Sequence, residues 1–391
     1  MTDNSGTTAT PGTTDTPGTT GPLGVAIVGC GIIGLNHARA ILRHPGLAIV
    51  ALVDAVPAAA QSLADTIVAD GGGPRPRVSA ELSDALAAGG IDLVVICTPS
   101  GLHVALAETA LAAGTHVVIE KPLDVSLPRA REILRLSQRA EQDGRVVSVI
   151  SQHRFDPASQ VVARAAHSGE LGRLTSAVAS VAWWRSQEYY DSGEWRGTWK
   201  LDGGGAVMNQ GVHTVDLLVW FLGRPVEVDA RTALLAHERV EVEDVAVATV
   251  RFASGALAVV HATTAAYPGL SVRLQVHGDR GSAIIDDDQL EYFGTAEAPG
   301  NRAADLVPAA ELRGGDRGPD YFVEGHLRQY EDVVAAIRNG RAPGVTVADA
   351  FLSLAVVRAV YLSATLGRPI QLDDVLDGSL DDVIVTTGVT A

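Results

Sequence analysis

The pattern of hydrophobic positions changes character near residue 150. Before that point, short continuous apolar runs alternate with longer stretches in which Ala and Leu recur every three or four residues. The first pattern suits buried strands and the second suits helices, so the chain here should alternate strand and helix. The expected strands are 23–29, 47–54, 91–98, 115–120 and 145–150, and the expected helices are 33–44, 56–69, 101–114 and 127–143. This alternation favours a parallel sheet with helices on both faces.

After residue 150 the pattern predicts two helices and then a series of strands. The helices are expected near 157–168 and over the stretch that begins at 203. Apolar runs separated by short Gly, Pro or Asp turns then predict strands at 226–236, 244–253, 255–264, 270–278 and 281–287. Consecutive strands without intervening helices indicate an antiparallel sheet. A Gly-, Ala- and Pro-rich loop is expected over 294–320, followed by helices near 322–339 and 347–366.

These elements divide the chain into three parts. The first is a Thr-, Pro- and Gly-rich stretch, 1–21, which is expected to be a disordered tail because its composition cannot form a core. An α/β domain with a parallel sheet should follow over 22–150, and an α+β domain with an antiparallel sheet over 151–391. The closing helices near 322–366 are expected to pack back on the first domain.

Composition and charge exclude several classes of protein. The 391 residues are 47% hydrophobic and 19% charged, as is ordinary for a globular enzyme of two domains. A net charge of −16 argues against partners such as nucleic acid or an anionic membrane. Two cysteines cannot form a disulfide scaffold, and we find no stretch suited to a membrane span. The tail lacks the basic start and apolar centre of a signal peptide, so a cytoplasmic location is expected.

A glycine motif follows the first predicted strand and opens the first predicted helix. It has the pattern GxGxxG, with an acid, Asp54, closing the second strand 25 residues beyond Gly29. In this context the glycines allow a tight turn and close approach of a pyrophosphate to the helix N-terminus, and the acid accepts from ribose hydroxyls. The charge of Asp54 would repel a 2′-phosphate, and its neighbours Ala55 and Val56 offer no arginine to receive one, so NAD is favoured over NADP. The motif residues are Gly29, Cys30, Gly31, Ile32, Ile33 and Gly34.

The two cysteines allow two interpretations. Cys30 lies in the glycine motif and Cys97 ends a strand expected beside the first, so the pair could be redox-active. Free cysteine is, however, among the most buried residue types, and neither residue belongs to a CxxC motif. The favoured interpretation is that both cysteines are small, buried residues that fill space in the core, which we call the filler interpretation.

The stretch GGGAVMNQGVHTVD, residues 203–216, places three polar side chains on one face of a predicted helix. Asn209, His213 and Asp216 have helical spacing among apolar neighbours. A metal site, an acid–base site and structural hydrogen bonding all fit that spacing. One imidazole, one amide and one carboxylate are a poor metal set, so no metal is expected. The glycines should let the helix begin close to cofactor and substrate, with Asp216 orienting His213 or holding the domain junction.

Several short motifs in order resemble one family. They are Thr98-Pro99 followed by His103, Glu120-Lys121-Pro122 directly after a strand, and the GGG segment with Asn209 and His213. Together, over residues 23 to about 370, they resemble the glucose-fructose oxidoreductase, inositol dehydrogenase and MocA family. The resemblance implies a Rossmann domain, a second domain with a large open antiparallel sheet, and NAD(P)-dependent oxidation or reduction of a sugar or polyol carbon.

The same resemblance assigns roles to individual residues. Lys121 resembles the family's catalytic lysine, Pro122 its cis proline, and His213 the histidine that contacts the reacting hydroxyl. Thr98, Pro99, His103 and Glu120 are expected around the cofactor. Asn209 stands where many members carry aspartate, which leaves a carboxylate-assisted proton relay in doubt.

The chemistry of Lys121 agrees with that role. Oxidation of a secondary alcohol needs a group that takes the hydroxyl proton, and Lys121 follows a strand at the edge of the sheet where ligands bind in such folds. Taken alone, a lysine in this position is more readily a surface residue paired with a carboxylate. The motif around it favours the catalytic interpretation.

An aromatic segment, 181–205, lies between the two predicted sheets. It contains four of the five tryptophans, and aromatic rings stack on the C–H faces of sugars while arginines donate to hydroxyls. A carbohydrate pocket and a subunit interface explain this composition equally well. The residues expected to contact substrate are Trp184, Arg185, Trp195 and Arg196, together with Arg154, Asn209 and His213. His153, beside Arg154, is more often a structural histidine.

The sequence therefore predicts an NAD-dependent dehydrogenase. Lys121 is expected as acid and base, with His213 orienting the hydroxyl or sharing its proton and Asn209 fixing it. The expected substrate is a neutral sugar, an anhydrosugar such as levoglucosan or a cyclic polyol such as inositol. The expected assembly is a homodimer or homotetramer formed through the antiparallel sheet. Two alternatives remain: an NAD-dependent glycosidase acting by oxidation and elimination, and a cofactor-sensing regulator without turnover.

Overall fold

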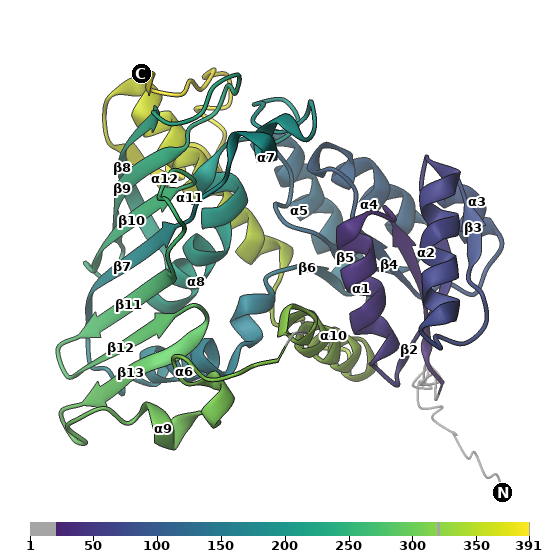
Figure 1. Cartoon of the computed structure of the whole chain (residues 1–391), viewed down its shortest axis with the longest axis horizontal. Coiled ribbons are helices and arrows are strands. Elements are labelled where there is room, and N and C mark those ends of the chain that lie inside the picture. The colour runs from purple at the N-terminus through teal and green to yellow at the C-terminus, as the bar shows by residue number, and fades with distance from the viewer. Residues whose placement is uncertain (1–20, 319–320, 391) are drawn as a thin grey trace, which may run out of the picture.

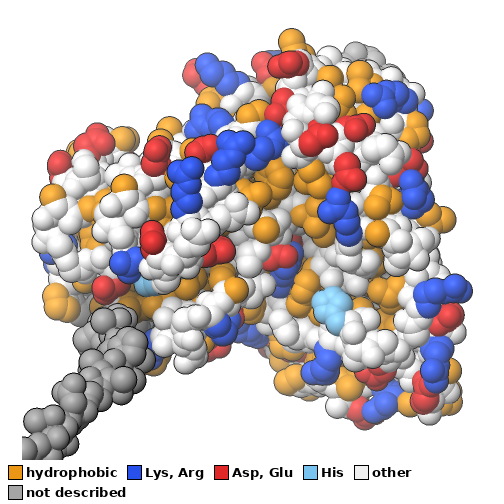
Figure 2. Space-filling view, turned by 180° about the vertical axis from the view of Figure 1, so that it is seen from behind, with side chains coloured by type: hydrophobic (Ala, Val, Ile, Leu, Met, Phe, Trp, Pro, Cys, Tyr) orange, Lys and Arg blue, Asp and Glu red, His pale blue; other side chains and the backbone are white. Residues whose placement is uncertain are grey.

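The protein folds into two lobes, each built around one sheet (Figure 1). The computed structural model describes residues 21–318 and 321–390, so all but the last residue of the predicted tail lies outside the described residues. The space-filling view from behind shows the hollow where the lobes meet (Figure 2).

The first lobe contains a six-stranded sheet in which every pairing is parallel, in the order β3-β2-β1-β4-β5-β6. The predicted α/β class is confirmed, and two short elements, β3 and α3, are additions to the prediction. Chain order reverses between β1 and β4, and in such sheets ligands bind at that point, outside the carboxyl ends of the strands. The strands are β1 (Leu23–Val28), β2 (Leu47–Val53), β3 (Arg77–Ser79), β4 (Leu93–Ile96), β5 (His116–Ile119) and β6 (Val147–Val149), and the helices are α1 (Ile32–Leu42), α2 (Pro57–Ala69), α3 (Leu82–Ala87), α4 (His103–Ala112) and α5 (Leu127–Gln142).

The second lobe contains a nine-stranded sheet in the order β13-β12-β11-β7-β10-β9-β8-β14, with β15 also paired to β8. Most pairings are antiparallel, as predicted, but β10 runs parallel to β7 and β15 parallel to β8, so the sheet is mixed. The strands are β7 (Leu174–Ala182), β8 (Pro225–Leu234), β9 (Val245–Phe252), β10 (Leu257–Thr263), β11 (Val272–Gly278), β12 (Gly281–Asp286), β13 (Gln289–Thr295), β14 (Ile370–Gln371) and β15 (Val389–Thr390).

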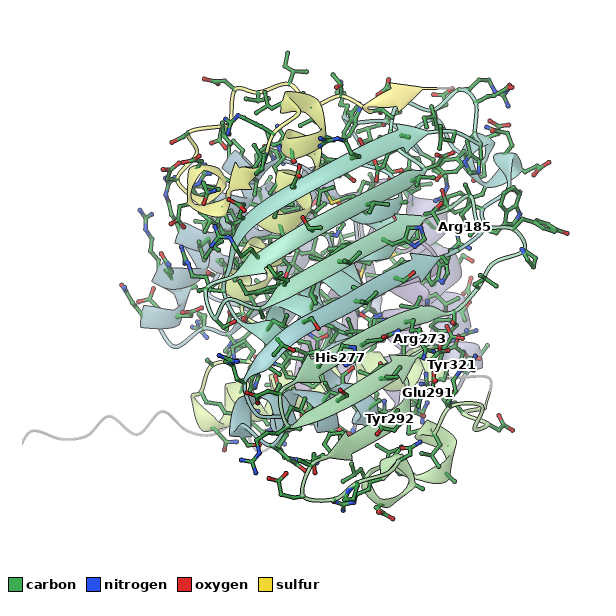
Figure 3. All side chains as sticks on the ribbon, turned by 90° about the vertical axis from the view of Figure 1, so that its left-hand side faces the viewer. Arg185, Arg273, His277, Glu291, Tyr292 and Tyr321 are labelled. Atoms are coloured by element: carbon green, nitrogen blue, oxygen red, sulfur yellow. The ribbon has the colours of Figure 1, made fainter. Side chains whose placement is uncertain are left out.

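The two faces of the second sheet differ because buried and exposed residues alternate along its strands. The inner face packs against α6 (Pro157–Ser168), α8 (Val212–Leu222) and α11 (Val347–Leu366). The outer face is open, and Figure 3 shows Arg273, His277, Glu291 and Tyr292 standing on its β11–β13 end. Helix α11 is long and apolar enough to cross a membrane, but 67% of its apolar window is buried inside the protein, as expected of a core helix.

The closing helices reach back to the first lobe. Helix α10 (Tyr321–Asn339) packs on α1 and covers one face of the parallel sheet, while α11 contacts α5 as well as β8 and α8. The shorter helices are α7 (Gln187–Asp191), α9 (Ala303–Leu306) and α12 (Leu372–Leu376), and a π-helical turn over Val207–Gly211 leads into α8. The two lobes are therefore joined by α10 and α11, which pack on helices of the first lobe.

Candidate active site

The glycine motif has the shape of a dinucleotide cradle. Gly29 has a φ of +96°, and a Cβ there would lie 2.7 Å from the Cys97 carbonyl oxygen, so glycine is required at the turn. A Cβ at Gly31, in contrast, would meet nothing within 4 Å, which leaves the helix N-terminus open to a pyrophosphate. The next side chain, Ile32, is 81% exposed. The residues present therefore fit NAD.

Asp54 is held in place from two sides. Its two carboxylate oxygens accept hydrogen bonds from the backbone N–H groups of Cys30 and Val56, both over 2.8 Å. These bonds join the acid to the glycine loop and fix its orientation beside the cradle. Each oxygen keeps a lone pair for a ribose hydroxyl.

Burial makes both cysteines poor nucleophiles. Desolvation and the charge of Asp54 raise the pKa of the Cys30 thiol to about 12, and burial raises the pKa of Cys97 well above its usual value. The thiolate is the reactive form, so these environments favour the filler interpretation over a redox pair.

His103 serves the loops around the cofactor site rather than the site itself. Its ring is fully buried, with Nδ1 3.1 Å from the Leu123 carbonyl oxygen and Nε2 3.0 Å from that of Thr98. Both ring nitrogens face backbone carbonyl oxygens, and burial lowers the pKa of His103, so the neutral ring donates to one of them. With no exposed surface, the side chain is closed off from the cofactor site. We therefore correct its expected role: His103 positions the loops that follow β4 and β5.

Glu120 also points inward. One carboxylate oxygen lies 2.8 Å from His37 Nε2 and 3.6 Å from His326 Nε2, and the other accepts from the Lys121 N–H over 2.9 Å. Burial alone would raise the pKa of Glu120, but hydrogen bonds from the two histidines hold it well below its usual value. A direct cofactor contact is thus not what the structure shows. Glu120 instead anchors the backbone of Lys121.

Lys121 and His213 meet between the lobes. Lys121 follows β5 and is joined to Pro122 by a cis peptide bond, and both line a small cavity with His213 and Ser151. Burial and the nearby charges of Lys121 and His153 hold the pKa of His213 well below its usual value, so its imidazole is neutral. The structure thereby brings together the lysine and the histidine that were predicted to share the reacting hydroxyl.

Asn209 lies on the π-helical turn that precedes α8. Its side-chain amide donates to the Gly204 carbonyl oxygen over 2.9 Å. The carbonyl oxygen of its side chain is the group left to contact a hydroxyl.

Two of the three glycines, Gly204 and Gly205, have a structural reason in addition to the one expected. Glu243, at the end of the segment before β9, accepts from the N–H groups of Gly205 and Val207, both over 2.9 Å. A Cβ on Gly205 would collide with Glu243, and one on Gly204 with the Tyr361 hydroxyl. The absence of side chains at these glycines thus lets Glu243 and Tyr361 cap the start of the helix from inside the core.

Glu243 and Tyr361 are functional residues that sequence reasoning missed. The Tyr361 hydroxyl donates to Glu243 over 3.0 Å and accepts from the Met208 N–H over 3.2 Å. Desolvation raises the pKa of the buried Glu243 carboxyl to about 7. The one sequence signal for Glu243 was its position beside Asp244, directly before the apolar strand β9.

Arg154, which was expected to contact substrate, is instead buried in an ion pair. It is 3% exposed, and its guanidinium forms a bidentate ion pair with Asp216, with both N–O distances 2.7 Å. Asp216 also accepts from the hydroxyls of Ser151 and Ser353. This network ties α8 to the end of β6 and to α11, so Asp216 holds the domain junction and is not available to a metal with His213.

His153 is a charged neighbour of His213. The two rings meet edge to face with centroids 5.0 Å apart, and His153 Nδ1 lies 2.9 Å from Asp156 and 3.3 Å from Asp288. Burial would lower the pKa of His153, but the two carboxylates outweigh it and raise the pKa to about 9. A protonated His153 therefore faces a neutral His213.

A cavity of about 500 Å³ opens on the other side of His213. It lies between α8, the β11–β12 end of the inner sheet face, and the start of α10. A volume in this range accommodates a small organic molecule.

The aromatic segment contributes less to this cavity than expected. Trp183 lines it, whereas the described lining does not include Trp184, Arg185, Trp195 or Arg196. Trp184 packs edge to face on Tyr267, and Arg185 lies over the Trp183 ring. Arg196 lies over the rings of Trp195 and Tyr189. These four side chains pair within the segment or with the neighbouring strand connection, because arginine and aromatic faces attract each other.

Comparisons with known proteins agree with this geometry. A model of an oxidoreductase family with an NAD-binding Rossmann fold matches residues 23–151, and a model of the GFO/IDH/MocA C-terminal domain matches 159–284. The scyllo-inositol 2-dehydrogenase (NAD(+)) of Bacillus subtilis is 26% identical over 358 residues, covering 89% of this chain and 96% of the relative.

Solved structures show the same fold. The WlbA dehydrogenase of Bordetella pertussis, in complex with NADH and UDP-GlcNAcA, is 32% identical with a TM-score of 0.77, covering 90% of this chain and 98% of that chain. A levoglucosan dehydrogenase in complex with NADH has a TM-score of 0.80 at 22% identity, covering 90% and 99%.

Proposed function

The chain belongs to the GFO/IDH/MocA family and is an NAD-dependent oxidoreductase of the sugar and polyol class, and on that premise we propose that it oxidises a secondary hydroxyl of a neutral sugar, anhydrosugar or cyclic polyol. The observation that carries the proposal is the shared cavity of Lys121 and a neutral His213 at the carboxyl edge of the parallel sheet. An acid–base group and a hydrogen-bonding partner are thus placed at one reacting hydroxyl.

In the proposed reaction Lys121 is the acid and base. When bound, NAD⁺ supplies the hydride acceptor for the carbon that carries the hydroxyl. The Lys121 amine takes the hydroxyl proton, neutral His213 holds the oxygen through a ring nitrogen, and the side-chain oxygen of Asn209 accepts from an adjacent hydroxyl. Glu120 holds the Lys121 backbone through its N–H and thereby limits the positions that the amine can reach.

A neutral substrate is supported by the charges around the larger cavity. Its described lining contains two cationic side chains, and both are paired: His153 with Asp156 and Asp288, and Arg317 with Glu311 over 3.3 Å. An anionic sugar would need a positive charge that is not already balanced by a carboxylate. Neutral hydroxyl groups can instead form hydrogen bonds to carboxylates and imidazoles whose charges are already balanced by their ion-pair partners.

The experiment that tests the proposal is a panel of neutral sugars, levoglucosan and inositols incubated with NAD⁺, with absorbance at 340 nm as the readout. Production of NADH with at least one panel member, unchanged by EDTA, is the expected result. Cleavage of a glycoside without net NADH would favour an oxidation–elimination glycosidase, and absence of both reactions would favour a cofactor-sensing regulator.

The open sheet face supports the proposed homo-oligomer. Val178, Val247, Leu257 and Val259 are exposed on the outer face of neighbouring strands. Contiguous apolar side chains on a monomer surface mark contact sites. Light scattering after size exclusion should report a dimer or tetramer, and a monomer at micromolar concentration would contradict this.

A further inference from the structure

The cavity beside His213 has two chemically different ends. At one end stand His213, His153 and Gln210, next to the small cavity that contains Lys121. The other end has a floor of aliphatic side chains from α8 and the inner sheet face: Leu217, Val272, Leu274 and Ile285. A polyhydroxylated ring would satisfy the first end and leave the second against apolar carbon.

Aromatic side chains also line the chamber, both along one side and at its mouth. Trp183 lines one side, and Tyr321 and Phe322 line the mouth at the start of α10. Their two rings stack with centroids 4.0 Å apart, yet Phe322 is 60% exposed and Tyr321 37% exposed. Exposed aromatic rings at the mouth of an apolar chamber indicate a ligand that covers them.

The charges at the rim of the chamber argue against a nucleotide-linked sugar as its ligand. Three carboxylates, Asp287, Asp288 and Asp316, line it, and both of its cationic side chains are already paired. A nucleoside diphosphate attached to the sugar would bring its phosphates against these carboxylates without a free cation to bind them. The chamber therefore suits an uncharged apolar group.

We infer that the substrate is a glycoside, whose sugar hydroxyl reacts at Lys121 and His213 while an uncharged aryl or alkyl aglycone occupies the chamber of Leu217, Val272, Leu274, Ile285, Trp183 and Phe322. This inference rests on the proposed function and narrows its substrate class. In the reaction the C–H and O–H bonds of one secondary alcohol break and a carbonyl forms. The hydride passes to NAD⁺, Lys121 takes the proton, and the glycosidic bond stays intact.

The test compares aglycones on a fixed sugar. Several neutral pyranoses are each supplied as the free sugar and as methyl and phenyl α- and β-glycosides, with UDP-glucose as the nucleotide arm. NADH formation gives kcat/KM, and calorimetry with NAD⁺ present gives Kd without requiring turnover. The phenyl glycoside of an accepted sugar should exceed the methyl glycoside at least tenfold in kcat/KM and in affinity, because the ring leaves water for an apolar chamber.

Two variants separate the chamber from a general surface effect. Phe322→Ala should reduce the phenyl-to-methyl ratio of kcat/KM at least threefold, because the lost ring contacts the aglycone. Tyr267→Ala removes an aromatic ring that is 77% exposed and lies outside the chamber lining, and it should leave the ratio unchanged.

The outcomes distinguish the inference from the proposed function. Equal kcat/KM and Kd for methyl and phenyl glycosides, or a preference for UDP-glucose, would overturn the inference while the sugar oxidation stands. If no sugar or glycoside yields NADH, the proposed function fails, and the Kd ratio alone then decides whether the chamber binds an aglycone.

Discussion

The hydroxyl of Tyr361, from the core helix α11, donates a hydrogen bond to the buried carboxylate of Glu243 over 3.0 Å. Together the two side chains satisfy the N–H groups of Gly205, Val207 and Met208. These groups begin the helix that carries Asn209 and His213, and helix N-termini need such acceptors. The core of the second lobe thus sets the position of the helix in the active site.

Replacing this cap should reduce turnover. In Glu243→Gln the amide group faces a backbone N–H that needs an acceptor, so the first turn shifts and His213 moves with it. We expect kcat to fall roughly tenfold while the Kd for NAD⁺ stays within twofold. The neighbouring Glu241→Gln is the matched control, because the Glu241 carboxylate accepts from the Trp199 N–H and, within the described residues, does not cap this helix. Equal kcat in the two variants would show that the cap does not position His213.

The charged state of His153 should make stability depend on pH. Its pKa is raised to about 9 in the folded protein from an ordinary value near 6.5, so the protonated ring stabilises the fold. That contribution is complete below about pH 6.5 and is lost as the pH rises through about 9. Urea unfolding should show the wild type losing roughly 3 kcal/mol more than His153→Gln over this interval. Parallel stability curves for the two proteins would mean that His153 is neutral in the fold.

The ion pair of Arg154 and Asp216 should contribute to stability rather than to substrate binding. Arg154→Lys keeps the charge but loses the bidentate geometry of a fully buried pair. We expect the free energy of unfolding to fall by about 2 kcal/mol and KM for sugar to change less than twofold. A variant of wild-type stability with a greatly raised KM would instead restore Arg154 to the substrate site.

Much of the first lobe could be predicted because its strands are short, continuous apolar runs with helices between them. The glycine motif and Asp54 were recognisable for the same reason: their roles depend on neighbours within one strand–helix–strand unit. Strand β7 was missed, and its parallel pairing with β10 depends on residues about 80 positions apart in the chain. No local period reports such a pairing.

The residues of the candidate site also divide into those that local motifs predict and those whose roles depend on partners distant in the chain. Lys121 and His213 were predicted from motifs, and the structure places them at one cavity. The ion pair of Arg154 was not foreseen because its partner Asp216 is 62 residues away. Glu243 was missed because the helix it caps begins 38 residues before it. Buried polar side chains are explained by their partners, and these partners are known only once the chain is folded.

The cofactor preference should follow from Asp54. With its carboxylate fixed by the Cys30 and Val56 N–H groups, it faces a 2′-phosphate with a negative charge. Calorimetry should give a Kd for NADP⁺ at least about tenfold above that for NAD⁺, a difference of about 1.4 kcal/mol. Asp54→Ala should reduce the ratio of the two Kd values, mainly by weakening the binding of NAD⁺. Equal Kd values for NAD⁺ and NADP⁺ in the wild type would contradict the assignment of Asp54 to the ribose.

The most direct measurement is the rate of NADH formation by Lys121→Met with a substrate that the wild type oxidises. The variant keeps the length of the side chain and removes its amine, so kcat should fall by roughly two to four orders of magnitude. The Kd for NAD⁺ should stay within about threefold, since the glycine cradle and Asp54 are untouched. A kcat within tenfold of the wild type would show that another group takes the proton, and would contradict the role of Lys121 as acid and base.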